Sequence, residues 1–392
     1  MASSYRAERV LREVGSMERA KVDNGPRVTT RARCRKAARD SLPVDPTVLA
    51  HVFSALRVHH GPIALETACA VCTSWHERVT ESNYLDEEPD LLIGELRSGD
   101  KPYRFDRPHD VIFLPCGDIC VADCDNFRLQ VVSREGIYVR DVRLSGGTSC
   151  PTGVAMGSGE ALFVVEHGAH QVSKLRRGSS SGHRHASAGS WGGGDGQLRH
   201  PWGVAVLNKR VVVSDAGNDR LCVFEHDKLT WLFNVGQSGR KPGEFCEPRG
   251  MAVDGDDLYV ADHRNHRVQV FECAGGAAGG LRPKRVIGGG PSAVAGRFNG
   301  PSGVCIANGK LHVAETAGQR LQVLTLAGLP LQTLGGCGPL SGVCADDEHV
   351  CATSLEGESA LTLWSRMPPP ESMEMISERN EVAKKRLSLS KA

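Results

Sequence analysis

A polar turn between two apolar runs recurs along this chain of 392 residues, and it limits the possible folds more than any other feature. The clearest copies are CVADCDNFRLQVV from Cys120, VVSDAGNDRLCVF from Val212 and YVADHRNHRVQVF from Tyr259. Weaker copies begin at Phe163, His312 and Cys351. A P-x-G-V-like motif precedes each copy, and its glycine position is taken in chain order by Asp110, Gly153, Gly203, Gly250, Gly303 and Gly342.

Each repeat contains short runs rich in Val and Leu that are separated by polar turns, which predicts β-strands. A single repeat cannot bury both faces of its sheet. A period of about 40 to 50 residues therefore predicts blades of about four strands, stacked radially into a β-propeller. The six copies predict six blades. Residues 89–108 resemble the end of a repeat, so residues 91–96 are expected to supply the outer strand of the last blade and to close the ring.

The repeats resemble NHL repeats over roughly residues 90–366. The shared pattern has an acid at the end of a strand, then an Asn three residues later and an Arg five residues later. Matching residues are Asp123, Asn126 and Arg128; Asp215, Asn218 and Arg220; Asp262, Asn265 and Arg267; the fifth copy keeps Glu315 and Arg320, and the second keeps only Glu166. Asp and Asn favour turns, and Arg can reach the Asp across the turn. Recurrence in several blades predicts a structural role for this trio.

Composition limits the other possibilities. Charge is nearly balanced, with a formal net charge of +1, and the propeller region has no basic excess. No window approaches 18 continuous apolar residues, so no membrane partner is expected. The N-terminus lacks the apolar core of a secretory signal, which favours a cytoplasmic or nuclear location. The 14 cysteines are therefore expected to be reduced and buried, and no metal site or cofactor is predicted.

Residues 41–80 form a separate segment with two apolar helical patterns, interrupted by HHGP at 59–62, within an acidic stretch (42–90) that carries 2 Lys/Arg against 8 Asp/Glu. Leu-Pro at its start and VCTSW at 71–75 resemble an F-box, although the link RVHHGP is longer than the family usually has. The resemblance implies docking to the Skp-type adaptor of a cullin ubiquitin ligase. The expected adaptor-binding residues are Leu42, Pro43, Leu49, Val52, Phe53, Leu65, Val71, Cys72 and Trp75.

The expected fold is thus mainly β: a six-bladed β-propeller of NHL repeats with a small N-terminal all-α F-box-like module. The expected order is a basic leader (1–40), the F-box-like module (41–80), the propeller (90–366) and a Pro-led tail (367–392). Two segments that break the repeat rhythm, Arg176–Gly196 and Cys273–Arg285, are expected to be flexible insertions.

The function expected from this order is a substrate-recognition adaptor that presents an unidentified protein target to the ligase. Turns and repeat starts would converge on one face of the propeller. Candidate target-binding residues there are His109, Phe127, His170, Trp202, Asp219, Arg249, His263, Arg264 and His266. Trp and Arg often contribute most of the binding energy of interfaces, and Trp202 is the sharpest candidate. His263, Arg264 and His266 are interpreted as exposed turn residues that the repeat does not share.

Two alternatives remain open. The first is an NHL propeller that binds RNA or acts as a general protein-interaction module. RNA binding would require a locally basic face. A metal-dependent lyase or lactonase would need His, Asp or Glu on several inner strands. The inner-strand stretches GVAM, GVAV, GMAV and GVCI offer none, so catalysis is not expected and no catalytic residue is assigned.

Overall fold

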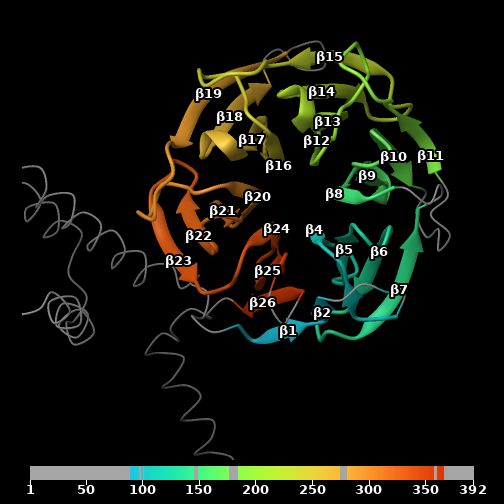
Figure 1. Cartoon of the computed structure of the whole chain (residues 1–392), viewed down its shortest axis with the longest axis vertical. Coiled ribbons are helices and arrows are strands. Elements are labelled where there is room, and N and C mark those ends of the chain that lie inside the picture. The colour runs from blue at the N-terminus through green and yellow to red at the C-terminus, as the bar shows by residue number, and fades with distance from the viewer. Residues whose placement is uncertain are drawn as a thin grey trace, which may run out of the picture. The chain divides into compact units, whose positions relative to one another are not determined.

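The computed structural model describes residues 89–96, 99, 101–144, 149–175, 184–273, 280–356 and 360–365. All of them belong to one compact unit, Leu85–Arg366. They form six four-stranded sheets arranged around a central axis (Figure 1). The predicted six-bladed β-propeller is confirmed. The leader, the F-box-like module and the tail lie outside the described residues.

Within each blade neighbouring strands are antiparallel, and their order runs from an inner strand near the axis to an outer strand at the rim (Figure 1). Blade 1 contains β4 (Pro108–Phe113), β5 (Ile119–Asp123), β6 (Arg128–Val132) and β7 (Tyr138–Arg143). Blade 2 contains β8 (Pro151–Met156), β9 (Leu162–Glu166), β10 (Gln171–Leu175) and β11 (Arg184–Ala188). Blade 3 contains β12 (Val204–Leu207), β13 (Arg210–Asp215), β14 (Arg220–Glu225) and β15 (Trp231–Val235).

The second half of the ring repeats this order. Blade 4 contains β16 (Pro248–Asp254), β17 (Asp257–Asp262), β18 (Arg267–Cys273) and β19 (Leu281–Gly288). Blade 5 contains β20 (Pro301–Ala307), β21 (Lys310–Glu315), β22 (Arg320–Thr325) and β23 (Pro330–Gly335). Short 3-10 turns lie at η1 (Ser158–Glu160), η2 (Ala216–Asn218) and η3 (His263–Asn265).

Blade 6 joins the two ends of the propeller. Three of its strands are β24 (Leu340–Ala345), β25 (His349–Ser354) and β26 (Leu361–Ser365), and the fourth is β1 (Leu91–Ile93). β1 pairs antiparallel with β26, and Ile93 lies opposite Leu361. The predicted closure is confirmed for residues 91–93. Residues 95–96 differ, because β2 (Glu95–Leu96) pairs instead with β3 (Arg104–Phe105).

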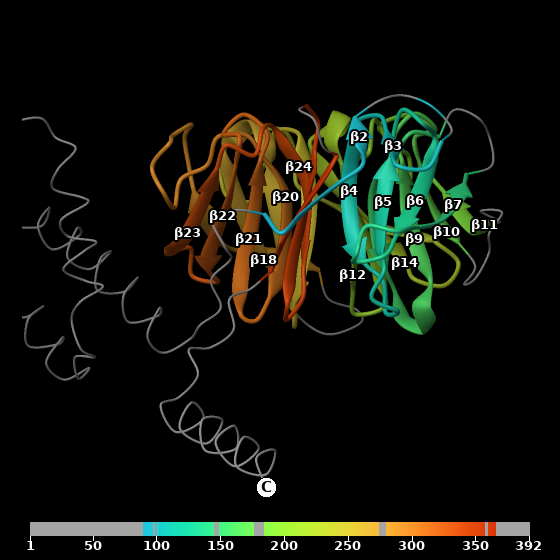
Figure 2. The same cartoon turned by 90° about the horizontal axis from the view of Figure 1, so that it is seen from below.

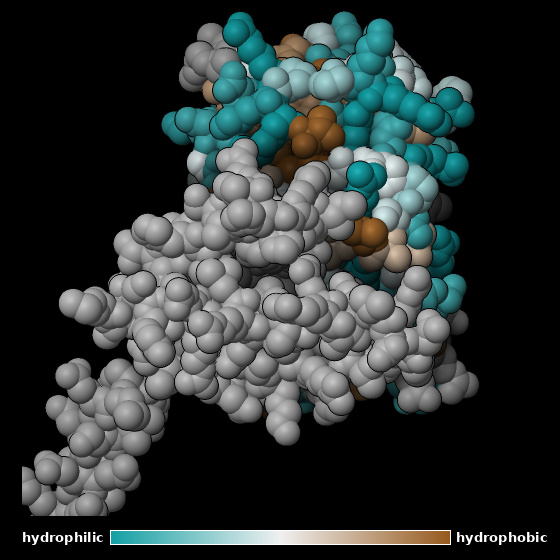
Figure 3. All heavy atoms as spheres, turned by 90° about the vertical axis from the view of Figure 1, so that its left-hand side faces the viewer, coloured by the Kyte–Doolittle hydropathy of each residue, from teal (hydrophilic) through white to brown (hydrophobic). Residues whose placement is uncertain are grey.

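The hydrophobic core is divided among the blade interfaces. Six clusters of buried side chains each join two neighbouring blades. Three residues before the first proline of blades 1, 3, 4 and 5, a fully buried side chain anchors the preceding loop: Phe105, Leu198, Phe245 and Phe298. The coloured part of the rim in Figure 3 is mainly hydrophilic, with hydrophobic side chains in small separate spots.

The innermost strands approach one another closely at the glycine of the P-x-G-V motif. A Cβ on Gly203 would lie 2.5 Å from the carbonyl oxygen of Arg249 in the next blade, so a side chain has no room there. Blade 1 is the exception, because Asp110 takes this position. Its carboxylate accepts the backbone N–H of Val154 in blade 2 at 2.9 Å, which ties two inner strands together.

The prediction that the two irregular segments are flexible insertions is wrong for residues 184–188 and 281–285, whereas residues 176–183 and 274–279 lie outside the described residues. Arg184–Ala188 is β11 and pairs with β10, while Leu281–Gly288 is β19 and pairs with β18. Both are outer strands that face solvent on one side, with alternating exposure in β11. Such strands need few apolar residues, so their composition resembles that of a loop.

Candidate binding site on the upper face

One end of the propeller carries the loops that lead into the inner strands and the turns between the second and third strands. We call it the upper face, and it is uppermost in Figure 2, where β2 and β3 are labelled. The candidate target-binding residues come from these loops and turns and from the first residues of the inner strands. The repeats therefore bring turns and repeat starts to the same face, as the sequence predicted.

The recurring trio is structural. In blade 4, Arg267 donates from Nε to Asp262 at 2.7 Å, and Asn265 donates to the same carboxylate at 2.9 Å. The Arg267 guanidinium also bonds the carbonyls of Arg240, Lys241 and Glu244 in the loop before the blade. Equivalent Arg–acid bonds occur in blades 1, 3 and 5. The trio thus fixes the hairpin turn and the preceding loop together.

Blade 2 keeps the acid but has no Arg at the usual position, and another strand supplies one. Glu166 is fully buried. Arg184 on the outer strand β11 donates from Nη2 to Glu166 at 2.5 Å and from Nε at 3.2 Å. Since a buried carboxylate without a partner is strongly destabilising, this substitution explains how the second repeat tolerates an incomplete pattern.

The interpretation of His263 and His266 as unshared, exposed residues is wrong. Blade 2 has His167 and His170 at the same positions after its acid, and all four histidines are partly buried. His167 Nδ1 lies 3.2 Å from the carbonyl of Pro201, and His263 Nδ1 lies 3.0 Å from that of Pro301. Both rings therefore donate to the first residue of the next blade.

The second histidine of each turn also links two blades. The backbone N–H of His200 donates to Nδ1 of His170 at 3.1 Å, and that of Gly300 donates to Nδ1 of His266 at 3.0 Å. In blade 3, Asp219 accepts the N–H of Glu247 in the same way at 2.8 Å. His170, His266 and Asp219 thus already bond within the propeller, which the sequence-based assignment to target binding did not anticipate.

Three other candidates, His109, Trp202 and Arg249, meet on the upper face where the inner strands of blades 1, 3 and 4 begin, and we call this group the channel mouth. Trp202 is half-buried, and its ring lies edge-on to His109, with ring centres 4.7 Å apart. The guanidinium of Arg249 lies over the Trp202 ring at 4.2 Å. These residues occupy the same repeat position in blades 1, 3 and 4. His109 is 4% exposed, so it packs against Trp202 and cannot contact a target directly. Its prediction as a target-binding residue is therefore wrong.

The electrostatics of this channel-mouth cluster follow from its burial. Burial lowers the pKa of His109 to about 3, and the positive charges of Arg107, Arg249 and His167 act in the same direction. Burial also lowers the pKa of Arg249 to about 10, against the raising effect of Glu247. Glu247 contacts Arg249 at 3.7 Å and Arg264 at 2.5 Å. It therefore links the channel mouth to the exposed turn of blade 4.

A pocket of about 580 Å³ opens beside that turn, between blades 4 and 5. His263, Arg264 and His266 line it together with Arg240 from the preceding loop. Sequence reasoning missed Arg240 and Glu247, because it assigned binding residues only to the turns and the repeat starts. It also missed His167 and His200, although the shared spacing of histidines in blades 2 and 4 could have indicated the former. Phe127, which is 43% exposed, lies apart on the blade 1 turn.

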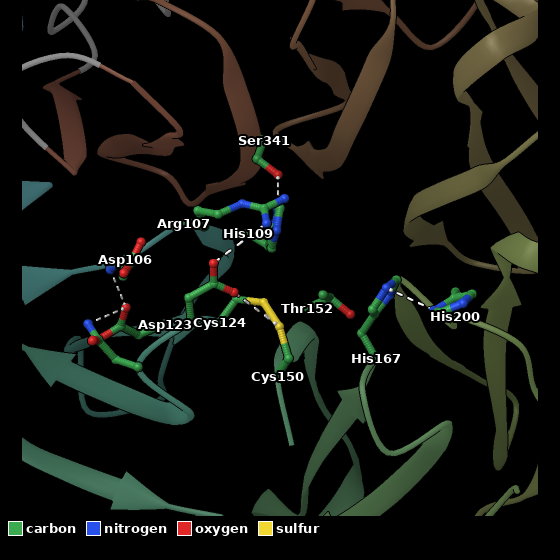
Figure 4. The surroundings of a disulfide bond; sticks show 12 residues. Asp106, Arg107, His109, Asp123, Cys124, Cys150, Thr152, His167, His200 and Ser341 are labelled. Atoms are coloured by element: carbon green, nitrogen blue, oxygen red, sulfur yellow. Dashed lines mark hydrogen bonds and ion pairs between the residues drawn. A yellow bond between two sulfur atoms is a disulfide. The ribbon is translucent and has the colours of Figure 1, made fainter. Parts of the chain in front are cut away.

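Two cysteines form a disulfide, which corrects the expectation that all are reduced. Cys124 in the blade 1 turn bonds Cys150, which precedes blade 2, and their Cα atoms are 4.4 Å apart. Figure 4 draws this disulfide with the His109–Ser341 and His167–His200 pairs of the upper face. Among the described residues, the one group of three potential metal ligands with closely spaced atoms is Cys124, Asp125 and Cys150. Its two sulfur atoms are bonded to each other.

We expect the Cys124→Ser/Cys150→Ser variant to lose about 3 kcal/mol of stability, since the disulfide closes a loop between two blades. Thermal unfolding with and without reductant would measure this. Reductant should lower the wild-type melting temperature to that of the variant. Cys116→Ser, at an exposed free cysteine, is the control. Free Cys124 and Cys150 thiols in the untreated protein would contradict the assignment.

His or Asp residues do occur on two inner strands of the propeller, β4 and β16. His109 and Asp110 lie on β4, whose sequence is not among the stretches GVAM, GVAV, GMAV and GVCI. Burial raises the pKa of Asp110 to about 7, partly offset by its bonds to the N–H groups of Val154 and Val111. Its carboxylate is thus engaged with backbone donors of two blades.

The buried histidine predicts a pH effect on stability. His109 has a folded-state pKa of about 3 and an ordinary value of 6.5, so below pH 6.5 the unfolded chain takes up a proton that the folded chain does not. Stability should therefore fall with acidification by up to about 1.4 kcal/mol per pH unit from this residue. His109→Gln should remove this part of the slope between pH 6 and about 4. Urea unfolding at several pH values measures the stability of both proteins. If stability falls with pH equally steeply in the wild type and in His109→Gln, the assignment of this effect to His109 is wrong.

The fold and the trio define the class of protein: a six-bladed β-propeller that contains NHL repeats. The sequence pattern described as "NHL repeat" matches residues 105–132, 198–224 and 245–271. These matches fall in blades 1, 3 and 4, which are the blades with the complete Asp-Asn-Arg trio.

Similarity to individual proteins is limited in extent. A stretch of 52 residues is 42% identical to B-box type zinc finger protein ncl-1 of Caenorhabditis elegans. Another match of 52 residues is 38% identical to Protein brain tumor of Drosophila melanogaster. Each covers 13% of this chain, and they cover 6% and 5% of the two relatives.

A solved gluconolactonase from Xanthomonas campestris shares the fold, with a TM-score of 0.53 and 15% identity. The similarity covers 73% of this chain and 99% of that one, and at this identity it concerns the fold alone. Within the described part of the chain, no helix is long and apolar enough to cross a membrane.

Proposed function

We propose that this chain is the substrate-recognition subunit of a cullin-type ubiquitin ligase. The F-box-like segment 41–80 would dock a Skp-type adaptor, and the upper face of the propeller would bind a protein target. The observation that supports target binding is the channel mouth, where Trp202 and Arg249 stack at a partly exposed position. Trp and Arg in such settings often dominate the binding energy of protein interfaces.

A non-catalytic role agrees with the engagement of the channel residues. The Asp110 carboxylate accepts two backbone N–H groups, and His109 bonds Ser341 and packs on Trp202. These groups hold blades together, so the proposal assigns the chain no reaction and no cofactor. Its proposed location is cytoplasmic or nuclear, where cullin ligases act. RNA binding by the propeller is the alternative function.

A pull-down of the Skp-type adaptor by the full chain tests the ligase role. We expect the adaptor to bind the wild type and the Trp202→Ala variant, but not a Leu42→Ala/Pro43→Ala variant. The reason is that Leu42 and Pro43 begin the F-box-like pattern, whereas Trp202 lies on the propeller. Absence of binding under conditions in which known F-box proteins bind would refute the ligase role, and RNA binding would then be tested.

A further inference from the structure

The pocket between blades 4 and 5 has walls from four separate segments. Ser238, Gly239 and Arg240 come from the loop before blade 4, and the turn His263–His266 forms a second side. Gly300 and Ala317 close it from blade 5. A pocket of about 580 Å³ is large enough to receive a side chain or a chain end.

The charges that line this pocket are of one sign. Arg240 and Arg264 are its charged residues, and no carboxylate is among the lining side chains. Arg264 is 64% exposed and bonds Glu247 through Nε, so the N–H groups of its two terminal nitrogens remain as further donors. Among the described residues, no ion pair engages the exposed guanidinium of Arg240. Two guanidinium groups are therefore available to a ligand.

A neutral donor adds to these cations. Because the N–H of Gly300 donates to Nδ1 of His266, the neutral ring carries its proton on Nε2 and can donate from there. His263 is the complement, since its Nδ1 donates to Pro301 and its Nε2 is left as an acceptor. The pocket thus offers several donors and one acceptor.

The turn that presents these groups is rigid before any ligand arrives. Asn265 bonds both Asp262 and the carbonyl of Gly239, so the turn is fixed to the loop that carries Arg240. Arg267 bonds the carbonyl of Arg240 itself at 2.6 Å. Groups that are held in place lose little freedom on binding, which favours affinity. Guanidinium groups suit carboxylate and phosphate because they donate two parallel hydrogen bonds.

We propose that this pocket binds an anionic oxygen group, a carboxylate or a phosphate, carried by the protein target, with Arg240 and Arg264 as the charged donors. The inference rests on the proposed function where it names a protein as the carrier. Two cations that line one pocket suit a single anionic group. A nucleic acid strand would need a row of cations along a groove.

In the test, the full chain is titrated with phenyl phosphate and with benzoate at constant ionic strength, and calorimetry measures the binding. We expect saturable binding of at least one probe, weakened at least tenfold in Arg240→Gln/Arg264→Gln. Arg199→Gln/Arg282→Gln removes the same charge at exposed positions outside the pocket and should bind like the wild type. Tighter binding of phenyl phosphate identifies a phosphate ligand, and tighter binding of benzoate a carboxylate. Equal affinity in all three proteins, or no saturable binding, overturns the proposal.

A second measurement needs no pocket variant. Cys246 lines the pocket, whereas Cys116 is an exposed thiol outside it. The bound probe should slow maleimide labelling of Cys246 and leave Cys116 unchanged. Labelling of Cys246 at the same rate with saturating probe would count against the site.

Two further arms separate the proposals. If an RNA oligonucleotide binds through Arg240 and Arg264 while neither small probe binds, the protein-target assignment is wrong. The same full-length variants are tested in the adaptor pull-down. Loss of anion binding with adaptor binding intact is expected for Arg240→Gln/Arg264→Gln. If the wild-type chain binds the anion but not the adaptor, the pocket proposal stands and the proposed ligase role is wrong.

Discussion

Replacing Arg267 by Met is expected to lower the free energy of unfolding by about 3 to 5 kcal/mol, because it leaves a buried carboxylate without its partner. Asp262 is fully buried, and Arg267 is 7% exposed. Arg267 also bonds three loop carbonyls, which would lose their donor. Burial already raises the pKa of Asp262, so the remaining carboxyl would take up a proton more readily.

The matched control lies three residues earlier in the same turn. Arg264 is 64% exposed and pairs with Glu247 on the surface, so Arg264→Met should change stability by less than about 1 kcal/mol. Urea unfolding of both variants and the wild type, monitored by circular dichroism, gives the comparison. Similar losses in the two variants would contradict the division of this turn into structural and surface arginines.

Replacing Ile93 by Asp is expected to cost more than about 3 kcal/mol and to open the ring. Ile93 is 3% exposed and lies in the cluster between blades 6 and 1, so the change would bury a charge without a partner. It also lies on the single strand, β1, that joins the start of the propeller to its last blade.

Leu92 is the control for this prediction, because neighbouring residues of a strand face opposite sides. It is 56% exposed, and Leu92→Asp should cost less than about 1 kcal/mol. Thermal unfolding and limited proteolysis would be measured for both variants. A ring that stays resistant to protease and equally stable with Ile93→Asp would show that β1 does not close it.

Particular residues show how far the sequence could lead. The trio around Asp262 recurs complete in blades 1, 3 and 4 and makes the same bonds in each, so its structural role could be predicted from recurrence. Closure by residues 91–93 could also be predicted, because the repeat region starts with the last part of a repeat and its final copy lacks that part. The outer strand β11 could not, because a strand that faces solvent needs no apolar pattern.

The candidate site was harder to predict than the fold. Trp202 and Arg249 are 47 positions apart, and their stacking depends on how blades 3 and 4 pack side by side, which no local pattern encodes. His266 and His170 were assigned to target binding, yet each already accepts an N–H from the next blade. The Cys124–Cys150 disulfide was missed for the same reason, since it joins a turn to the start of the neighbouring repeat.

The sequence by itself determined the blade count, the strands of each complete repeat and the role of the Asp-Asn-Arg trio. These depend on local periodicity and on contacts within one repeat and its adjoining loop. Only the tertiary structure decided which side chains from different blades meet at the channel mouth, how Arg240 and Arg264 come to line one pocket, and which histidines are already bonded. Those contacts depend on the radial stacking of blades, which places residues far apart in the chain within a few ångströms of one another.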